Sequence, residues 1–142
     1  MKKVFFLVIS LFVIAGCSKK EVKLEAFSAE AFAYDIGDGT AEVNATVRVK
    51  GFTQIEKNDN YNAEVSYVVD LVRPDNSVKS AIFKYDQKSE KNEAMLDIPL
   101  EAQFLLDSTS KSGTYTLVFK IEDKNSQSKT EAKVNFDLKW EL

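Results

Sequence analysis

The sequence predicts an all-β fold, an antiparallel sandwich of about seven strands. Apolar and polar residues alternate with a period of two in the segments 40–50, 114–123 and 132–140. This period places one face of each strand against a core and the other face in water. Clusters of turn-forming residues separate the segments, and no segment has a convincing helical period. Short, half-buried strands joined by turns are typical of a sandwich.

The other strands follow the same plan less regularly. We expect them at 22–34, 63–72, 78–85 and 93–106, with a helical turn at 101–106 as an alternative. The mixed charges of residues 88–93 predict a solvated loop. Residues that favour turns lie between the predicted strands, at Gly37-Asp38-Gly39, Lys57-Asn58-Asp59-Asn60, Pro74-Asp75-Asn76 and Lys124-Asn125-Ser126.

The composition excludes several classes of function. A chain of 142 residues suits one domain. Acidic residues outnumber basic ones, 22 to 19, so the chain lacks the basic surface that nucleic acid requires. Histidine is absent and cysteine occurs once, which excludes histidine catalysis, an intrachain disulfide and a multi-cysteine zinc site. We expect no cofactor and no enzymatic activity.

Residues 1–16 have the organisation of a signal peptide. Met1, Lys2 and Lys3 form a positive head, and residues 4–16 are uncharged and largely apolar. The apolar run is shorter than the roughly 20 residues that a spanning helix needs. The segment therefore predicts export and removal rather than a membrane span.

The apolar run ends in Ile14-Ala15-Gly16-Cys17, which resembles the lipobox of bacterial lipoproteins. The resemblance implies cleavage before Cys17 and a lipid on its thiol, which would hold the protein to a membrane of the cell envelope. An ordinary secretory signal with an incidental cysteine is the alternative. Residues 17–21 would form a short tether to a domain at 22–142. Ser18, in place of the aspartate that often signals inner-membrane retention in this family, favours the outer membrane in a Gram-negative host.

The carboxyl-terminal third contains Ser112-Gly113-Thr114-Tyr115-Thr116-Leu117, which resembles the tyrosine corner of immunoglobulin-like domains. The resemblance implies structural roles for Gly113 and Tyr115, whose hydroxyl would bond to upstream backbone. Leu117 stands where antibody domains place a cysteine, which favours the broad immunoglobulin-like or fibronectin-like group. The alternative is that Tyr115 is a core aromatic of an unrelated sandwich.

Candidates for chemistry are few. Asp35 and Asp38, with Asp59 or Asp123 from neighbouring loops, could supply oxygen ligands to calcium. Their spacing does not match an EF-hand, and Asp-Gly is a common turn pair, so a turn is the favoured interpretation. We therefore expect no metal site.

Not all of the aromatic residues in the following set fall on the inward phase of their strands: Phe27, Phe32, Tyr34, Phe52, Tyr61, Phe83 and Tyr85. Exposed members would be candidate contacts for a partner, and burial at the ends and edges of the sandwich is the alternative. Phe52 and Tyr61 flank one polar loop and are our first partner-binding candidates. We expect a lipid-anchored binding or structural module of the cell envelope that recognises a protein. The alternative is a carrier or inhibitor that binds a lipid, a glycan or a hydrolase.

Overall fold

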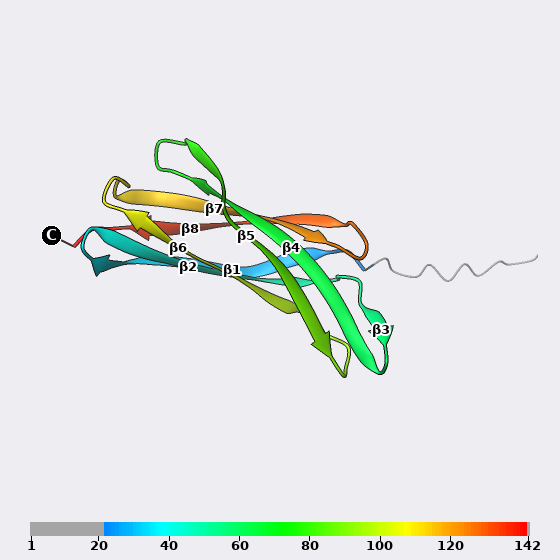
Figure 1. The fold of residues 1–142 in the computed structure, drawn as a ribbon. Helices are drawn as coiled ribbons and strands as arrows, with labels where there is room; N and C mark the ends of the chain where they lie inside the picture. Colours follow the sequence, from blue (N-terminus) through cyan, green and yellow to red (C-terminus); the bar gives the residue numbers. More distant parts are fainter. Residues whose placement is uncertain (1–21, 142) are drawn as a thin grey trace, which may run out of the picture.

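The computed structural model describes residues 22–141, which form two antiparallel β-sheets packed face to face (Figure 1). The predicted signal segment 1–16, the lipobox and Cys17 lie outside the described residues. The strands found between residues 22 and 141 are β1 (Glu25–Gly37), β2 (Thr40–Lys50), β3 (Ile55–Lys57), β4 (Asn60–Val72), β5 (Val78–Lys91), β6 (Ile98–Asp107), β7 (Gly113–Asp123) and β8 (Lys129–Leu138). No helix in this part of the chain is both long and apolar enough to cross a bilayer.

The two sheets differ in width. Sheet A has the order β1-β2-β6, and sheet B has the order β5-β4-β7-β8, with the short β3 beside the first residues of β4. On one side of the sandwich β1 contacts β8 closely, whereas on the other side β5 and β6 touch only slightly. Sheet B therefore extends past the edge of sheet A at β5.

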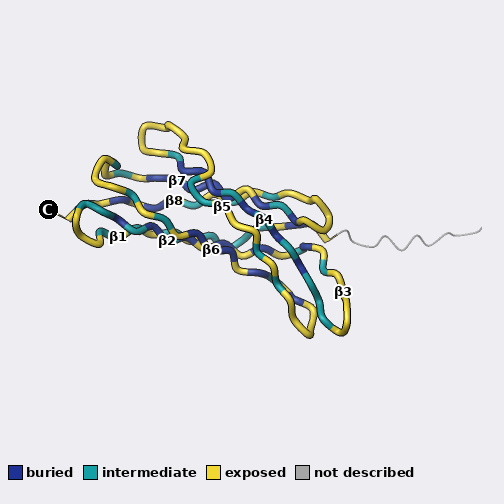
Figure 2. Tube along the Cα trace, viewed as in Figure 1, coloured by how far each residue is buried: buried dark blue, intermediate teal, exposed yellow. Residues whose placement is uncertain are grey.

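The core lies between the sheets and follows the alternation of the sequence. Val43, Val47 and Val49 of β2 are fully buried, and they share the core with Leu117 and Phe119 of β7. Buried and exposed segments alternate along both sheets in Figure 2. Burying each such side chain stabilises the fold by about 1.5–3 kcal/mol, so this core is the main source of stability.

Two hairpins use the turn residues that the sequence predicts. Asp38 and Gly39 connect β1 to β2 with φ angles of 56° and 68°, and Asn58 and Asp59 connect β3 to β4 with 51° and 60°. Positive φ at both central residues is the signature of the type I′ turn, which matches the twist of the flanking strands. These residue types tolerate that conformation best, so turn chemistry sets the register of both hairpins.

Three strand predictions require correction. The short strand β3 was not predicted, and β5 continues to Lys91 although its last residues were predicted to be a loop. Lys91 pairs with Tyr61 of β4, so backbone pairing overrides the charged composition. The predicted strand 93–106 begins only at Ile98, and residues 101–106 form strand rather than a helical turn.

Candidate binding surfaces

The structure places the carboxylates considered for calcium in structural roles. Asp35 accepts hydrogen bonds from the backbone N–H groups of Gly37 at 2.8 Å and Glu141 at 3.1 Å. Asp38 belongs to the β1–β2 turn, whereas at the other end of the sandwich Asp59 lies in the β3–β4 turn and Asp123 is the last residue of β7. Within residues 22–141 no group of three acidic, histidine or cysteine side chains converges on a metal-sized site.

Phe52, predicted to contact a partner, lacks the exposure that this role requires. Its side chain is only 7% exposed and belongs to the core. Gly51 has a φ of +76°, and a Cβ there would collide with the carbonyl oxygen of Lys23, so the chain turns tightly just before Phe52. Tyr61 is half-buried and packs against the same core. The two residues therefore close one end of the sandwich and do not present two exposed rings.

Tyr115 and Gly113 hold the start of β7. The buried Tyr115 hydroxyl donates to the carbonyl oxygen of Lys111, four residues upstream, at 2.7 Å. Burial raises the pKa of this hydroxyl. A Cβ on Gly113 would lie 2.8 Å from Cγ of Pro74, and its φ of +147° also favours glycine. The contact joins the β4–β5 and β6–β7 loops.

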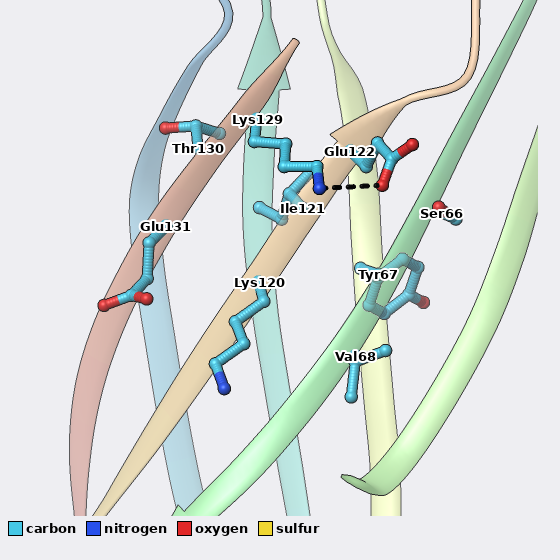
Figure 3. Close-up of a pocket in the computed structure, with 9 residues that line it drawn as sticks. All are labelled: Ser66, Tyr67, Val68, Lys120, Ile121, Glu122, Lys129, Thr130 and Glu131. Atoms are coloured by element: carbon cyan, nitrogen blue, oxygen red, sulfur yellow. Dashed lines mark ion pairs between the residues drawn. The ribbon is translucent and has the colours of Figure 1, made fainter. Parts of the chain in front are cut away.

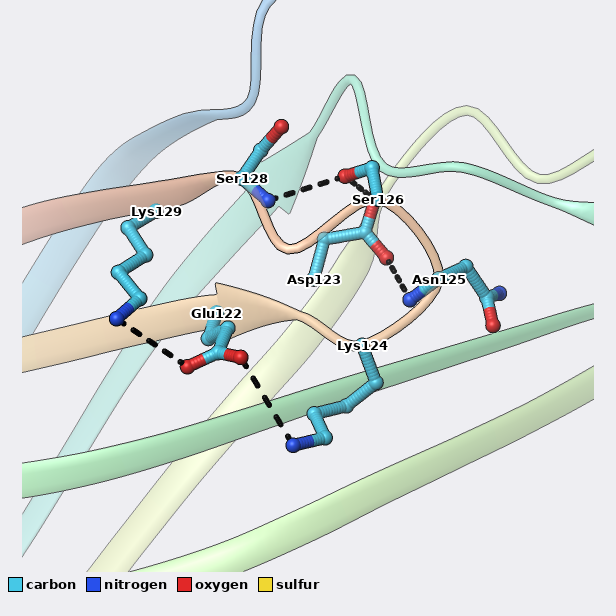
Figure 4. A network of polar contacts seen from close by, with 7 residues as sticks. All are labelled: Glu122, Asp123, Lys124, Asn125, Ser126, Ser128 and Lys129. Carbon is cyan, nitrogen blue, oxygen red and sulfur yellow. Dashed lines mark hydrogen bonds and ion pairs between the residues drawn. The ribbon is translucent and has the colours of Figure 1, made fainter.

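Asp123 joins the two sheets at the opposite end. Its carboxylate accepts hydrogen bonds from the N–H of Asn125 at 3.0 Å and the hydroxyl of Ser126 at 2.7 Å (Figure 4). It also accepts a hydrogen bond from the N–H of Thr53 at 2.7 Å. Burial by itself would raise the pKa of Asp123. The hydrogen bonds from Ser126, Thr53 and Asn125 outweigh this effect, so the pKa of Asp123 is lowered. Because Thr53 follows β2 and Asn125 follows β7, the carboxylate connects sheet A to sheet B.

The outer face of sheet B is covered by paired charges. Lys120 bonds to the buried Asp70 at 2.6 Å, and Glu122 lies between Lys124 at 3.8 Å and Lys129 at 3.7 Å. A shallow hollow of about 600 Å³ runs along this face between β4, β7 and β8 (Figure 3). Its charged groups already have partners within the chain, so the hollow offers little unsatisfied chemistry.

The outer face of sheet A carries a group of exposed large apolar side chains. Phe32 is 58% exposed, Tyr34 45%, and Leu105 60%, and Ile36 continues the row along β1. The rings of Phe32 and Tyr34 stack at 6.2 Å between centroids, with 20° between their planes. Cross-strand register aligns Tyr34 and Leu105 on either side of Glu42. We call Phe32, Tyr34, Ile36 and Leu105 the aromatic face.

Hydrogen bonds fix the polar centre of this surface. Glu42 accepts bonds from the amide of Asn44 at 2.8 Å and from the hydroxyl of Tyr34. Bonds from Asn44, Tyr34 and Gln103 lower the pKa of Glu42, and the bond to Glu42 raises the pKa of Tyr34. Glu42 is therefore a carboxylate at neutral pH, and the hydroxyl of Tyr34 is held beside it.

A second candidate surface lies where β5 overhangs β6. A cleft of about 510 Å³ opens there, with Tyr67, Phe83 and Tyr85 on one side and Glu101 and Gln103 on the other. Phe32, Tyr34 and Tyr85 are thus the exposed members of the aromatic set noted in the sequence, and Phe27, Tyr61 and Phe83 are half-buried.

Comparison with known proteins supports the fold and leaves function open. No protein-family model matches the chain, and no curated protein matches it. Among solved structures, a β-glucuronidase 2 of Bacteroides uniformis, covalently bound to cyclophellitol-6-carboxylate aziridine, has a TM-score of 0.51 at 8% identity over 79% of this chain. A second β-glucuronidase, from glycoside hydrolase family 2, has a TM-score of 0.45 at 12% identity over 80% of this chain. The N-terminal domain of PorA has a TM-score of 0.42 at 13% identity, covering 75% of this chain and 83% of that one.

The matched region is a small part of the enzymes. This chain spans only 13% of the first glucuronidase and 11% of the second. The similarity to the first enzyme therefore concerns a small part of that chain and shows the fold alone. Together with the strand order, it supports the immunoglobulin-like sandwich predicted from the sequence.

Proposed function

We propose that this chain is a lipid-anchored binding module of the bacterial cell envelope, which recognises a protein partner through the aromatic face. The lipobox resemblance at Cys17 supports the anchor, and Ser18 favours the outer membrane in a Gram-negative host. The observation that carries the binding role is the aromatic face itself. Contiguous exposed apolar side chains are uncommon on proteins without partners, and Phe and Tyr are typical anchors of interfaces.

The charge around the aromatic face favours a basic partner. Glu30, Glu42, Glu101 and Asp107 point outward on the same side of sheet A. Two copies of this chain facing each other would bring these carboxylates together, which opposes self-association. A partner carrying Arg or Lys beside apolar side chains would pair with Glu42 and stack its cation on Phe32 or Tyr34.

The position of the face suits a tethered protein. The chain enters the sandwich at Leu24, whereas Phe32 and Tyr34 lie in the far half of β1. At about 3.3 Å per residue, Tyr34 stands roughly 30 Å along the strand from the point of entry. The short tether would keep one end of the domain near the lipid and leave the aromatic face accessible.

Photo-crosslinking in intact cells tests the proposal. Benzoylphenylalanine replaces Tyr34 in one variant and Lys133, on the outer face of sheet B, in a matched control. We expect a crosslinked protein from position 34 and none from position 133. Equal products from both positions, or none from position 34, would refute the aromatic face as the binding surface.

A separate variant tests the anchor. Cys17→Ser removes the only thiol, so we expect the protein to shift from the membrane fraction to the soluble fraction. Mass spectrometry of the membrane-bound wild-type protein should find acyl groups on Cys17. An unmodified Cys17 would refute the anchor without affecting the crosslinking result.

A further inference from the structure

The unequal width of the two sheets leaves aromatic side chains uncovered between them. In the register of β4 with β5, Phe83 pairs with Val69 and Tyr85 with Tyr67. Partners in register point to the same side of a sheet, so Phe83 and Tyr85 point toward the interior of the sandwich. Sheet A ends at β6 and provides no strand opposite them. Tyr85 is consequently 52% exposed although it lies on the inward side of its sheet.

The resulting cleft has an ordered aromatic wall. The ring of Tyr67 lies 6.0 Å from that of Phe83, with 27° between their planes, and 6.2 Å from that of Tyr85, edge to face. The Tyr67 hydroxyl donates to the carbonyl oxygen of Glu101 on β6 at 2.5 Å. This bond joins β4 to β6 and fixes the position of the Tyr67 ring in the protein without a ligand.

The edge of β6 beside the cleft is poorly suited to an added peptide strand. Strand addition uses a row of free backbone N–H and C=O groups. Pro99 has no N–H, and the carbonyl of Glu101 already accepts the Tyr67 hydroxyl. Two successive edge positions beside the cleft therefore weaken the ladder that a peptide would form.

The charge of the cleft excludes an anionic ligand. None of the described side chains that line it is basic, and Glu101 contributes a carboxylate. The amide nitrogen of Gln87 donates to the carbonyl oxygen of Lys88 and the hydroxyl oxygen of Ser89, each at 3.4 Å, and the side chain of Gln103 bonds to Glu42. The amide oxygen of each glutamine can still accept a hydrogen bond from a ligand. An acyl chain would leave these polar groups without partners, which is costly in a closed complex.

We infer that the β5–β6 cleft is a binding site for a neutral saccharide. The apolar C–H face of a sugar ring stacks on Tyr85 and Phe83, and its hydroxyl groups bond to the amides of Gln87 and Gln103 and to the carboxylate of Glu101. The volume of about 510 Å³ lies within the usual range of small-ligand sites. This site adjoins the aromatic face through Glu101 and Gln103 of β6, but its aromatic wall is on β4 and β5 and it does not depend on the proposed protein partner.

Calorimetric titration tests the inference. The full chain, kept in a detergent without a sugar headgroup, is titrated with four neutral hexasaccharides, the malto-, cello-, manno- and chito-oligosaccharides, and with an anionic hyaluronan hexasaccharide. We expect at least one neutral sugar to bind and the hyaluronan fragment to bind at least tenfold more weakly. If none of the neutral sugars binds at 5 mM, or the anionic one binds equally well, the inference is wrong.

Three variants locate the binding. Tyr85→Ala should weaken the affinity at least tenfold, and Tyr85→Phe, which keeps the stacking ring, should remain within about threefold of the wild-type chain. Ile55→Ala removes a side chain of similar exposure, 53%, on β3, outside both the cleft and the aromatic face, and should leave sugar affinity unchanged. Thermal unfolding of each variant checks that the fold is intact. Equal effects of Tyr85→Ala and Ile55→Ala would overturn the assignment to the cleft.

Discussion

The outer face of sheet B and the aromatic face of sheet A cover the same core but differ in chemistry. On sheet B, charged side chains from adjacent strands pair with one another, as Lys129 of β8 does with Glu122 of β7 at 3.7 Å. On sheet A, the rings of Phe32 and Tyr34 and the side chain of Leu105 are exposed, although burial would favour them. Both sheets meet the demands of folding through their inner faces. The difference therefore points to sheet A as the surface where this chain meets other molecules.

The largest expected effect comes from removing the two stacked rings of the aromatic face. Phe32→Ala combined with Tyr34→Ala should weaken partner binding by about 3 kcal/mol, roughly a hundredfold, because exposed aromatics are typical interface hot spots. The free energy of unfolding should change by less than about 1 kcal/mol. Co-purification from detergent-solubilised envelopes measures the first quantity and urea unfolding the second. Lys84→Ala combined with Lys133→Ala, on sheet B, is the control, and equal losses in both variants would remove the distinction between the faces.

The next effect lies beneath the charged face. Asp70 accepts a hydrogen bond from the N–H of Ala81 at 2.8 Å, where β5 bulges, and also pairs with Lys120. Asp70→Ala should lower the free energy of unfolding by about 2 kcal/mol, because it leaves a partly buried donor and an ammonium group without their partner. Urea unfolding measures this change. Glu131→Ala, in an exposed pair of the same face, is the control. A loss as small as that of the control would mean that Asp70 does not hold the bulge.

A pH dependence should follow from the same residue. The bonds from Lys120 and Ala81 lower the pKa of Asp70 below its unfolded value of about 3.9. A lowered pKa contributes stability above the unfolded value and loses it as the pH falls through the folded value. Between pH 5 and pH 3 the urea midpoint of the wild-type chain should therefore fall more steeply than that of Asp70→Ala. Parallel curves for the two proteins would contradict this assignment.

The smallest effect is expected for an isolated ion pair on sheet B. Lys133→Ala should change the free energy of unfolding by less than about 0.5 kcal/mol, because water screens exposed pairs. Urea unfolding at low and high salt measures the change. A loss above 1 kcal/mol would show that the charged face contributes to stability as a network, and the contrast between the two faces would need revision.

Strands in which apolar and polar residues alternate regularly could be predicted from the sequence. The segment 40–50 was expected to be a strand and is one with the same bounds, because each inward residue of β2 is apolar and each outward one polar or charged. The strand β3 has three exposed residues and no periodicity to detect. The burial of Phe52 depends on the turn at Gly51, which a pattern of apolar residues does not encode.

The candidate surfaces were harder to predict, for two physical reasons. On β1, Ala29, Ala31 and Ala33 face inward and the large side chains face outward, the reverse of the usual preference. A register shift between Phe27 and Glu30 further obscures the phase. The cleft depends on strand order, because Tyr85 is uncovered only where sheet B is wider than sheet A. Sequence patterns identified these aromatics as a set but could not separate the exposed rings from the buried ones.

The place of the aromatic face on β1 has a mechanical consequence. Phe32 and Tyr34 belong to the first strand that the chain forms after its predicted tether. A partner held at these rings and pulled away from the membrane would load the covalent backbone of β1 between the tether and the rings. The remaining strands would lie outside the path of the force. The sandwich could then bear tension between two parts of the envelope without shearing the hydrogen bonds between its strands.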